Sequence, residues 1–487
     1  MPEEKRGQQA VSTSPLMPLD NGWLKETAVK VRARQTAWEG YQRAELISSE
    51  ELQMLRDAEQ AGRDKQFRAV LDKEPQYAAL YTRLFGKLSR ADTIQQVVLL
   101  ADDLVQAAPD RLDAFLNVPQ LYASLLKLLD VQDAFVSLKA AQFLALFLTT
   151  QSASSSHGAP PEEVLEKLLV FLNKQLQTAL DGGDHDTDGN AVSIALLILG
   201  EVVRQAPFRT RVWKQAVQAP KAVQSSVVGT LVSLEEKMAS STRGGTQTPR
   251  EGTAGYPQLQ YQGLFVLWVL TFDPEAAAGI DEHFELATVL VRLAQTALKH
   301  KIVRLIVGIW DNMLTAPGTS EEDNATRLLG AKVLPLCKTL QERNYPDDEM
   351  RDQLKYVVSV LSNRLDQMSS YEEYQSELQS KHLSFDNPVH KLDEFWKENA
   401  EKLVEHNEQD LKLLVSLVKP ETHSDVTTLA VACHDIGRFV HHFETGRRRV
   451  TALGAKDAIM GLVDYDDSEV RHAALQTLAV LVSSSWK

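Results

Sequence analysis

Apolar residues recur at steps of three and four along most of this chain, and short polar stretches separate the segments that carry them. This spacing predicts amphipathic helices of about 10–20 residues, because 3.6 residues per turn place such positions on one face. Representative segments from Ala78 onward are TIQQVVLLADDLVQ, EEVLEKLLVFLNKQLQ and AVSIALLILGEVV. No window shows the sustained apolar–polar alternation that is typical of a strand. The predicted fold class is therefore all-α.

The predicted helices recur in pairs about every 40 residues, without strict sequence identity. This period is typical of HEAT and armadillo solenoids, in which each pair buries its apolar face only by stacking on its neighbours. The clearest pair is LVDYDDSEVRHAALQTLAVLV (462–482), which starts its second helix after an acidic turn. The residues expected to face inward from that helix are Val470, Ala474, Leu478 and Leu481.

A cation at a fixed position supports true repeats. Arg471 stands where HEAT repeats commonly carry arginine, and Lys139 takes that place in the looser copy 128–148. The alternative is that these are two unrelated amphipathic helix pairs. We favour an armadillo- or HEAT-like helical solenoid.

Breaks in the helical pattern predict how the chain is organised. Residues 1–20 have the Ser- and Pro-rich composition of a disordered tail. Residues 21–369 are predicted to form an N-terminal HEAT-like solenoid, and residues 370–487 a smaller C-terminal HEAT-like helical domain, because the stretch 365–390 is polar and poor in leucine. Three further breaks, predicted to be surface loops, are 153–162, 180–190 and 241–258.

Composition narrows the function classes. The chain has 487 residues and a formal net charge of −14, whereas free-standing nucleic-acid binders usually have a basic surplus. Cys337 and Cys433 are its two cysteines, far apart and without a CxxC, which favours a reducing, cytosolic environment. The first residues lack the apolar core of a signal peptide. The apolar runs 264–272 and 191–200 are shorter than the roughly 20 residues that span a bilayer, so membrane association is expected only through a partner.

The segment 425–443 most suggests chemistry, because a His434-Asp435 doublet stands beside two further histidines. The pattern predicts a helix that Asp425 caps. At about 100° per residue, Asp435 falls near the side opposite the apolar seam, so we interpret the doublet as part of a solvated face. His434 and His441 lie about 10.5 Å apart along the axis, too far for one metal ion to bridge. The apolar seam is expected to be Val426, Leu429, Cys433, Ile436, Val440 and Phe443.

Three arginines, Arg447, Arg448 and Arg449, follow this helix. One interpretation is charge compensation, because cations are favourable at the negative end of a helix dipole. Another is a basic docking patch for an acidic protein partner, and a third is contact with nucleic acid. The sequence leaves these open, with charge compensation favoured.

The segment DHDTDG (184–189) resembles the start of an EF-hand calcium loop, including its glycine. The twelfth position, which should supply a bidentate glutamate, is Ala195. We therefore expect a solvated loop rather than a calcium site.

Motifs for catalysis are missing from the sequence: there is no Walker A loop, GxGxxG, GxSxG, HExxH or zinc spacing. We therefore predict no catalytic, cofactor-binding or metal-binding residues and no cofactor. Helical solenoids mostly present surfaces to partners, so the residues alone indicate an interaction scaffold.

The two ends of the chain resemble a known family. The C-terminal sequence contains Pro388-Val389-His390-Lys391, Phe395-Trp396-x-Glu398-Asn399, Ala432-x-His434-Asp435-Ile436-Gly437 and Gly454-Ala455-Lys456. These segments, together with WEGYQRAELISSEEL (38–52), resemble the H subunit of the vacuolar-type proton ATPase (V-ATPase). The middle, 90–360, agrees mainly in its helical pattern.

The resemblance implies a non-catalytic regulatory component of the soluble sector of a rotary proton pump. Such a component is needed for coupled ATP hydrolysis and proton transport, and it inhibits hydrolysis by the detached soluble sector. The implied partners are the peripheral stalk, the stator and rotor of the catalytic sector, and the cytosolic part of the membrane sector. The implied location is the cytoplasmic face of vacuolar or endosomal membranes, or the cytosol when detached.

The resemblance also implies an inhibitory loop in the C-terminal domain. The matching interval is VKPETHSDV (418–426), in which Pro420 interrupts the helix before the projecting residues Glu421, Thr422, His423, Ser424 and Asp425. The alternative is an ordinary turn with Asp425 as a cap. For the whole chain, the alternatives are a HEAT/armadillo adaptor or import carrier in membrane trafficking, and an HD-type metal phosphohydrolase.

Overall fold

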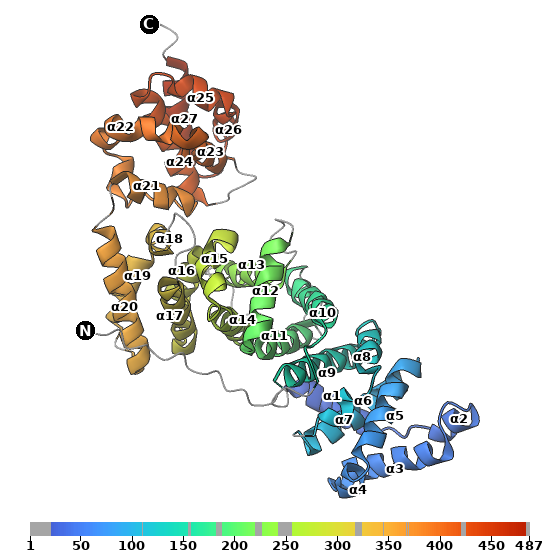
Figure 1. Ribbon diagram of the computed structural model, residues 1–487. Coiled ribbons are helices and arrows are strands. Elements are labelled where there is room, and N and C mark those ends of the chain that lie inside the picture. Colours follow the sequence, from blue (N-terminus) through green and yellow to red (C-terminus); the bar gives the residue numbers. More distant parts are fainter. Residues whose placement is uncertain are drawn as a thin grey trace. The chain divides into compact units, whose positions relative to one another are not determined.

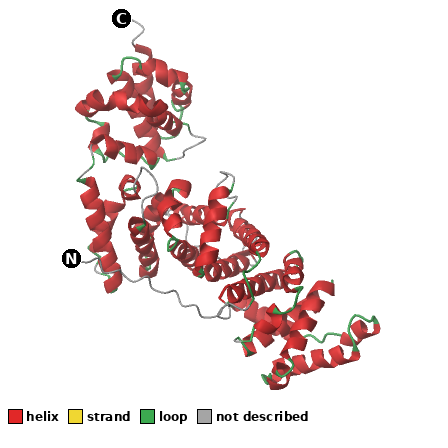
Figure 2. Cartoon of the chain, in the orientation of Figure 1, coloured by secondary structure: helices red, strands yellow, loops and turns green. Residues whose placement is uncertain are grey.

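A computed structural model describes residues 21–109, 111–153, 157–181, 188–219, 226–241, 256–316, 324–343, 345–366, 368, 370–419 and 425–483. All regular structure in these ranges is helical, which confirms the all-α prediction (Figure 2). The helices form two compact units, residues 1–276 and 277–487. The predicted division at 369/370 stays a prediction, and so does the tail 1–20, which lies outside the described residues.

The first unit contains the helices shown from blue to green in Figure 1. Their bounds are α1 (Gly22–Arg32), α2 (Trp38–Arg43), α3 (Ser49–Asp64), α4 (Arg68–Leu71), α5 (Glu74–Lys87), α6 (Ala91–Ala107), α7 (Asp113–Leu116), α8 (Leu121–Leu129), α9 (Ala134–Ala153), α10 (Glu162–Asp181), α11 (Asp188–Arg204), α12 (Ala206–Gln218), α13 (Val227–Ser241) and α14 (Tyr256–Leu270). The boundary between the units falls inside α15 (Pro274–Phe284).

The second unit runs on to the C-terminal helices. Its elements are α16 (Leu286–Thr296), α17 (His300–Thr315), α18 (Asn324–Gly330), α19 (Val333–Gln341), α20 (Asp348–Leu365), α21 (Ser370–Gln379), η3 (Pro388–His390), α22 (Asp393–Asn399), η4 (Ala400–Val404), α23 (Glu405–Leu417), α24 (Val426–His442), α25 (Gly446–Ala452), α26 (Ala455–Gly461) and α27 (Ser468–Ser483).

The helices stack as a solenoid requires. In the first unit α8 packs on α9, α10 on α11 and α13 on α14, while α8, α10 and α13 follow one another in one layer and α9, α11 and α14 in a second. In the second unit α16 with α17 and α19 with α20 repeat the same arrangement. Each pair thus covers the apolar face of the next, which confirms the armadillo-like repeats.

The repeat cations hold these layers together. Lys139 on α9 lies 2.8 Å from Asp102 on α6, and both side chains are buried. Arg471 on α27 donates to the carbonyl oxygens of Tyr465 and Asp466, at 2.6 and 2.8 Å. The two positions therefore tie a helix to the segment before it, as the repeat interpretation predicts.

The helix α9 is apolar on every side. It has 20 residues and a mean hydropathy of 1.2, so by length and composition it could span a membrane, and the pair α11–α12 passes the same test only as a span bent by 114°. The sequence interpretation considered only uninterrupted apolar runs and missed α9. Because 89% of its apolar window is buried against neighbouring helices, α9 is explained as the core helix of this unit.

Candidate functional site

The predicted inhibitory loop lies between α23 and α24. Pro420, Glu421, Thr422, His423 and Ser424 fall outside the described residues. Asp425 is described, and its carboxylate accepts a hydrogen bond from the backbone N–H of Thr428 at 3.1 Å. The predicted N-cap of α24 is therefore confirmed, while an inhibitory role for this loop stays a prediction.

The predicted basic patch does not lie on a turn, because Arg447, Arg448 and Arg449 form the start of α25. Arg447 donates to the carbonyl oxygen of Val480 on α27 at 3.3 Å, and Arg449 forms an ion pair with Glu408. Arg448 is exposed. Two of the three cations thus support internal contacts, and Arg448 is the one best placed to meet a partner.

The His434-Asp435 doublet is not on a solvated face, so that interpretation is wrong. Asp435 has 0% of its side chain exposed, while His434 retains 24%. The reason is that α24 is covered from several sides: α27 packs on the seam, and α22, α23 and η3 cover other faces. A helical wheel shows which residues share a face, but not that a second face is also covered.

Asp435 pairs with His390 on η3. Its carboxylate lies 2.8 Å from His390 Nδ1, and the imidazole is 0% exposed. On the other side of the ring, His390 Nε2 lies 3.6 Å from the Glu377 carboxylate on α21. The ring packs edge-on against Tyr374, with 5.7 Å between ring centroids. We call Glu377, His390 and Asp435 the buried triad.

The triad keeps its histidine charged. Burial alone would lower the pKa of His390, but Asp435 and Glu377 outweigh it and raise that pKa to about 10. Burial likewise opposes the charged form of Glu377, yet His390, Lys332 and Asn387 lower its pKa. The triad is therefore an imidazolium held between two carboxylates at neutral pH.

This arrangement is structural rather than reactive. The imidazolium occupies the place between the carboxylates that a metal ion would need, and the described residues contain no group of three or more His, Cys, Asp or Glu that could hold a metal. Cys433, also on α24, is 0% exposed, and burial raises the pKa of its thiol to about 12, far from a reactive thiolate.

The calcium-like segment is only partly described. Asp184 and Asp186 lie outside the described residues, and Asp188 and Gly189 begin α11. Ala195, at the position of the missing glutamate, is 0% exposed within that helix. The predicted loop 241–258 also lies mostly outside, because α13 ends at Ser241 and α14 begins at Tyr256.

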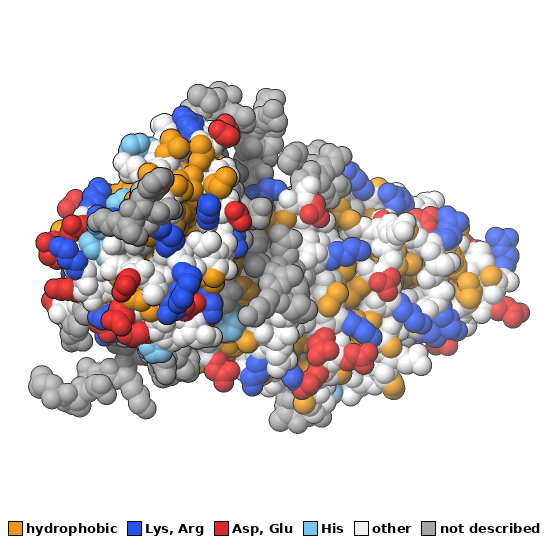
Figure 3. Space-filling view, turned by 90° about the horizontal axis from the view of Figure 1, so that it is seen from above, with side chains coloured by type: hydrophobic (Ala, Val, Ile, Leu, Met, Phe, Trp, Pro, Cys, Tyr) orange, Lys and Arg blue, Asp and Glu red, His pale blue; other side chains and the backbone are white. Residues whose placement is uncertain are grey.

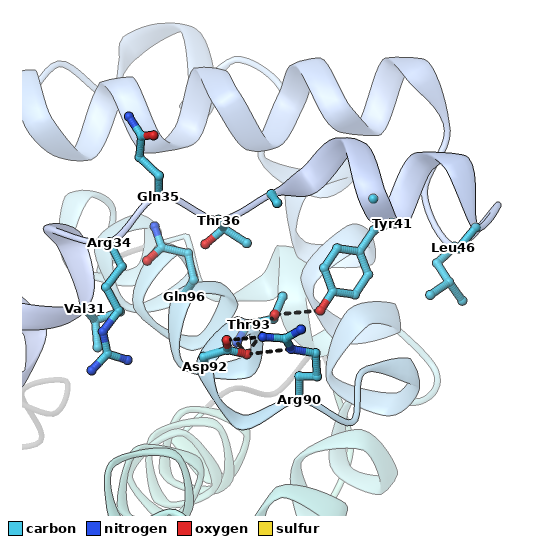
Figure 4. A pocket seen from close by; sticks show the side chains of 13 residues that line it. Val31, Arg34, Gln35, Thr36, Tyr41, Leu46, Arg90, Asp92, Thr93 and Gln96 are labelled. Atoms are coloured by element: carbon cyan, nitrogen blue, oxygen red, sulfur yellow. Dashed lines mark hydrogen bonds and ion pairs between the residues drawn. The ribbon is translucent and has the colours of Figure 1, made fainter.

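A pocket of about 470 Å³ lies between the α1–α2 connection and the start of α6 (Figure 4). The hydroxyls of Tyr41 and Thr93 lie 2.6 Å apart, and Asp92 accepts from Thr93 and from Arg90. These polar groups satisfy one another, so the pocket offers a hollow without converging free groups for a substrate.

The surface carries both signs of charge. Acidic and basic side chains are intermingled, with small apolar groups between them, on the face that Figure 3 shows. The net charge of −14 therefore does not produce one acidic field there.

The sequence interpretation did not single out Glu377 or Lys332. Lys332 lies in the α18–α19 turn, and its ammonium is 3.1 Å from the Glu377 carboxylate. The one signal available was His390 within the family-like Pro388–Lys391 segment, since a buried histidine needs partners.

Comparison with known proteins identifies the family at both ends of the chain. The N-terminal family model for the H subunit of the V-ATPase matches residues 22–361, and its C-terminal counterpart matches residues 367–486. A designed armadillo repeat protein of known structure is 13% identical, covers 64% of this chain and 99% of its own, and has a TM-score of 0.24, too low to add to the assignment.

Curated relatives agree along nearly the full length. The V-type proton ATPase H subunit of Drosophila melanogaster is 28% identical, over 95% of this chain and 91% of its own. A probable H subunit of Caenorhabditis elegans, the second of two forms, is 26% identical over 95% and 92%, and one of Oryza sativa is 26% identical over 92% and 95%. The resemblance seen in the sequence is thereby confirmed, in preference to the adaptor and hydrolase alternatives. The chain belongs to the H-subunit family of the V-ATPase, whose members are non-catalytic regulatory components of the V1 sector.

Proposed function

We propose that this chain regulates the pump by mechanical contact, supporting coupled ATP hydrolysis and proton transport in the assembled complex and inhibiting hydrolysis by detached V1. The observation that carries this proposal is the match of both family models, which together reach from residue 22 to residue 486. Stacked helix pairs supply long contact surfaces, and such surfaces suit a protein that grips several other proteins at once.

The proposed partners are the peripheral stalk, the stator and rotor of V1, and the cytosolic part of the membrane sector. A protein that touches stator and rotor together blocks rotation without a catalytic group. The proposed location is the cytoplasmic face of vacuolar or endosomal membranes, with membrane association through the complex.

Reconstitution tests this function. The chain is added to V1 prepared without its H component, and separately to otherwise complete pumps that lack it. We expect ATP hydrolysis by free V1 to fall, and ATP-driven proton uptake by vesicles carrying the complete pump to be restored. Unchanged hydrolysis in the first assay, at saturating binding, contradicts the braking role.

The proposed contact for the brake is the interval 420–425, with Arg448 as an additional docking cation. Its flanks support this choice, since Asp425 fixes the start of α24 and leaves the five preceding residues between two helices. Deleting 420–424 is expected to relieve inhibition of V1 while the chain still binds. The matched control deletes 183–187, a five-residue polar stretch before α11, and is expected to inhibit fully.

A further inference from the structure

The second unit contains a close contact between α18 and α21. A Cβ atom at Gly330, the last residue of α18, would lie 2.2 Å from the carbonyl oxygen of Ser376 and 2.7 Å from its carbon. Because those neighbours are backbone atoms, they cannot move aside as the end of a side chain would. The two helices therefore meet backbone against backbone, and only glycine fits at this position.

A charge contact lies beside this glycine. Lys332 adopts a left-handed conformation, with φ of 65°, at the turn that starts α19. Its ammonium reaches the carboxylate of Glu377 at 3.1 Å, although Glu377 is only 1% exposed while Lys332 is 38% exposed. A second ion pair, Lys381 with Glu285, links the end of α21 to the residue before α16.

Glu377 is held firmly from its own side. Its Oε1 accepts from the backbone N–H of Ser384 at 2.8 Å, and its Oε2 accepts from the Asn387 side chain at 2.7 Å. His390 lies next to it and is fixed in turn by Asp435, which also receives a 3.3 Å contact from His434. The Glu377 carboxylate thus belongs to the C-terminal core, and Lys332 approaches it from outside.

The charges explain why Lys332 is needed. The buried triad contains two carboxylates and one imidazolium, so it carries a net charge of −1 by itself. The ammonium of Lys332 brings that sum to zero. Separating α18–α19 from α21 would leave one uncompensated negative charge in a site that water scarcely reaches, and such charges are costly.

We propose that Lys332, Glu377 and the Gly330–Ser376 contact form a lock that fixes residues 370–487 to the helices before them, and that releasing Lys332 frees this C-terminal part to move as a folded body. We call it the α18–α21 lock. It deepens the proposed function, on which only its enzymatic consequence rests, because a brake must hold a defined position.

A distance measurement on the isolated full chain decides the matter. Spin labels are placed on introduced cysteines at Lys355, exposed on α20, and Met460, 55% exposed on α26. The native Cys337 and Cys433 are 0% exposed, so they stay unlabelled in the folded chain. We expect a narrow distance distribution for the parent and at least a twofold broader one for Lys332→Glu.

Matched variants separate the lock from general damage. Lys338→Glu makes the same charge change at an exposed site on α19 and is expected to keep the narrow distribution. Lys332→Arg keeps the cation and is expected to do so too. Far-ultraviolet circular dichroism of Lys332→Glu should match the parent, since both parts remain folded. An equally narrow distribution for Lys332→Glu and the parent overturns the lock.

The enzymatic consequence is measured separately. Lys332→Glu is expected to need at least fivefold more protein than the parent for half-maximal inhibition of V1, whereas Lys332→Arg is not. If the parent itself fails to inhibit V1, the proposed function fails, and the distance measurement still decides the lock because it needs no V1.

Discussion

Single residues carry buried charge in two different ways. His390 is a cation between two carboxylates, so its charge is compensated. Glu235 on α13 is 0% exposed, and neither of its oxygens has a hydrogen-bond partner among the described residues. Burial raises the pKa of Glu235 well above its ordinary value, which favours the neutral acid. The first residue stabilises the fold when charged, and the second when neutral.

His390→Gln is expected to lower the free energy of unfolding at pH 7 by about 3–5 kcal/mol, because it leaves buried carboxylates without their cation. Urea denaturation measures this, with the exposed His472→Gln as control. The folded pKa of about 10 lies above the unfolded value of about 6.5. The contribution is therefore complete below pH 6.5 and is lost as pH rises towards 10. A stability gap that stays constant from pH 6 to pH 9.5 contradicts this assignment.

Glu235→Gln is expected to stabilise the chain at alkaline pH, since it removes a carboxyl that must ionise without a partner. The folded pKa is raised, so the parent loses stability as pH rises above about 4.5. The variant's advantage should grow by up to about 1.4 kcal/mol per pH unit until the folded pKa is reached. Thermal unfolding at pH 5 and pH 8 checks this, and Glu236→Gln, exposed on the same helix, should show no such trend.

Sequence reasoning reached some of these residues and missed others for one physical reason. Asp425, Lys139 and Arg471 act within or next to their own helix pair, so local spacing predicted them. The burial of Asp435 and the role of Glu377 depend on η3 and α21, which return to α24 from other parts of the chain. Arg447–Arg449 were assigned to a turn because Gly446 resembles a helix stop, yet it begins α25.

Among the elements, α24 is the centre of the C-terminal helices, and its closest partner is α27. The two approach at Gly437, where an added Cβ would lie 2.9 Å from the Thr477 hydroxyl oxygen. That hydroxyl is already committed, because it donates to the carbonyl oxygen of Cys433 at 2.6 Å in a buried position. Neither helix can therefore yield without losing a buried hydrogen bond.

Gly437→Leu is expected to lower the free energy of unfolding by about 1–3 kcal/mol through overpacking between α24 and α27. Gly461, at the end of α26, has nothing within 4 Å of an added Cβ. The control Gly461→Ala is therefore expected to be neutral or slightly stabilising. Chemical denaturation compares the two, and equal stability of both variants would show that the contact at Gly437 is looser than the structure indicates.

Element positions followed from the sequence more reliably than their surroundings did. The inward face of the last helix was predicted correctly: Val470 and Ala474 are 0% exposed, Leu481 is 6% exposed and Leu478 packs against the same core. The apolar character of α9, by contrast, exceeds what one amphipathic stripe requires, and only the helices around it account for that excess.

For the whole molecule, the proposed docking cation gives a further prediction. Arg448→Glu is expected to weaken binding to V1 about threefold to tenfold at low salt, because an exposed charge mainly steers association. The difference should shrink near 0.5 M salt, where screening acts over about 4 Å. Titration with labelled protein at two salt concentrations measures it, and Lys338→Glu serves as the distant control. Equal affinities of parent and variant at low salt would remove Arg448 from the interface.

The environment of α9 also limits where the chain can be cut for expression. Its faces are covered by α6 and α8 before it and by α10 and α11 after it. A fragment that stops ahead of Glu162 would present a 20-residue apolar helix to solvent on one side. Such a fragment should precipitate or be held by chaperones, whereas one extended through Arg204 keeps this helix covered and is the better starting piece for crystallisation.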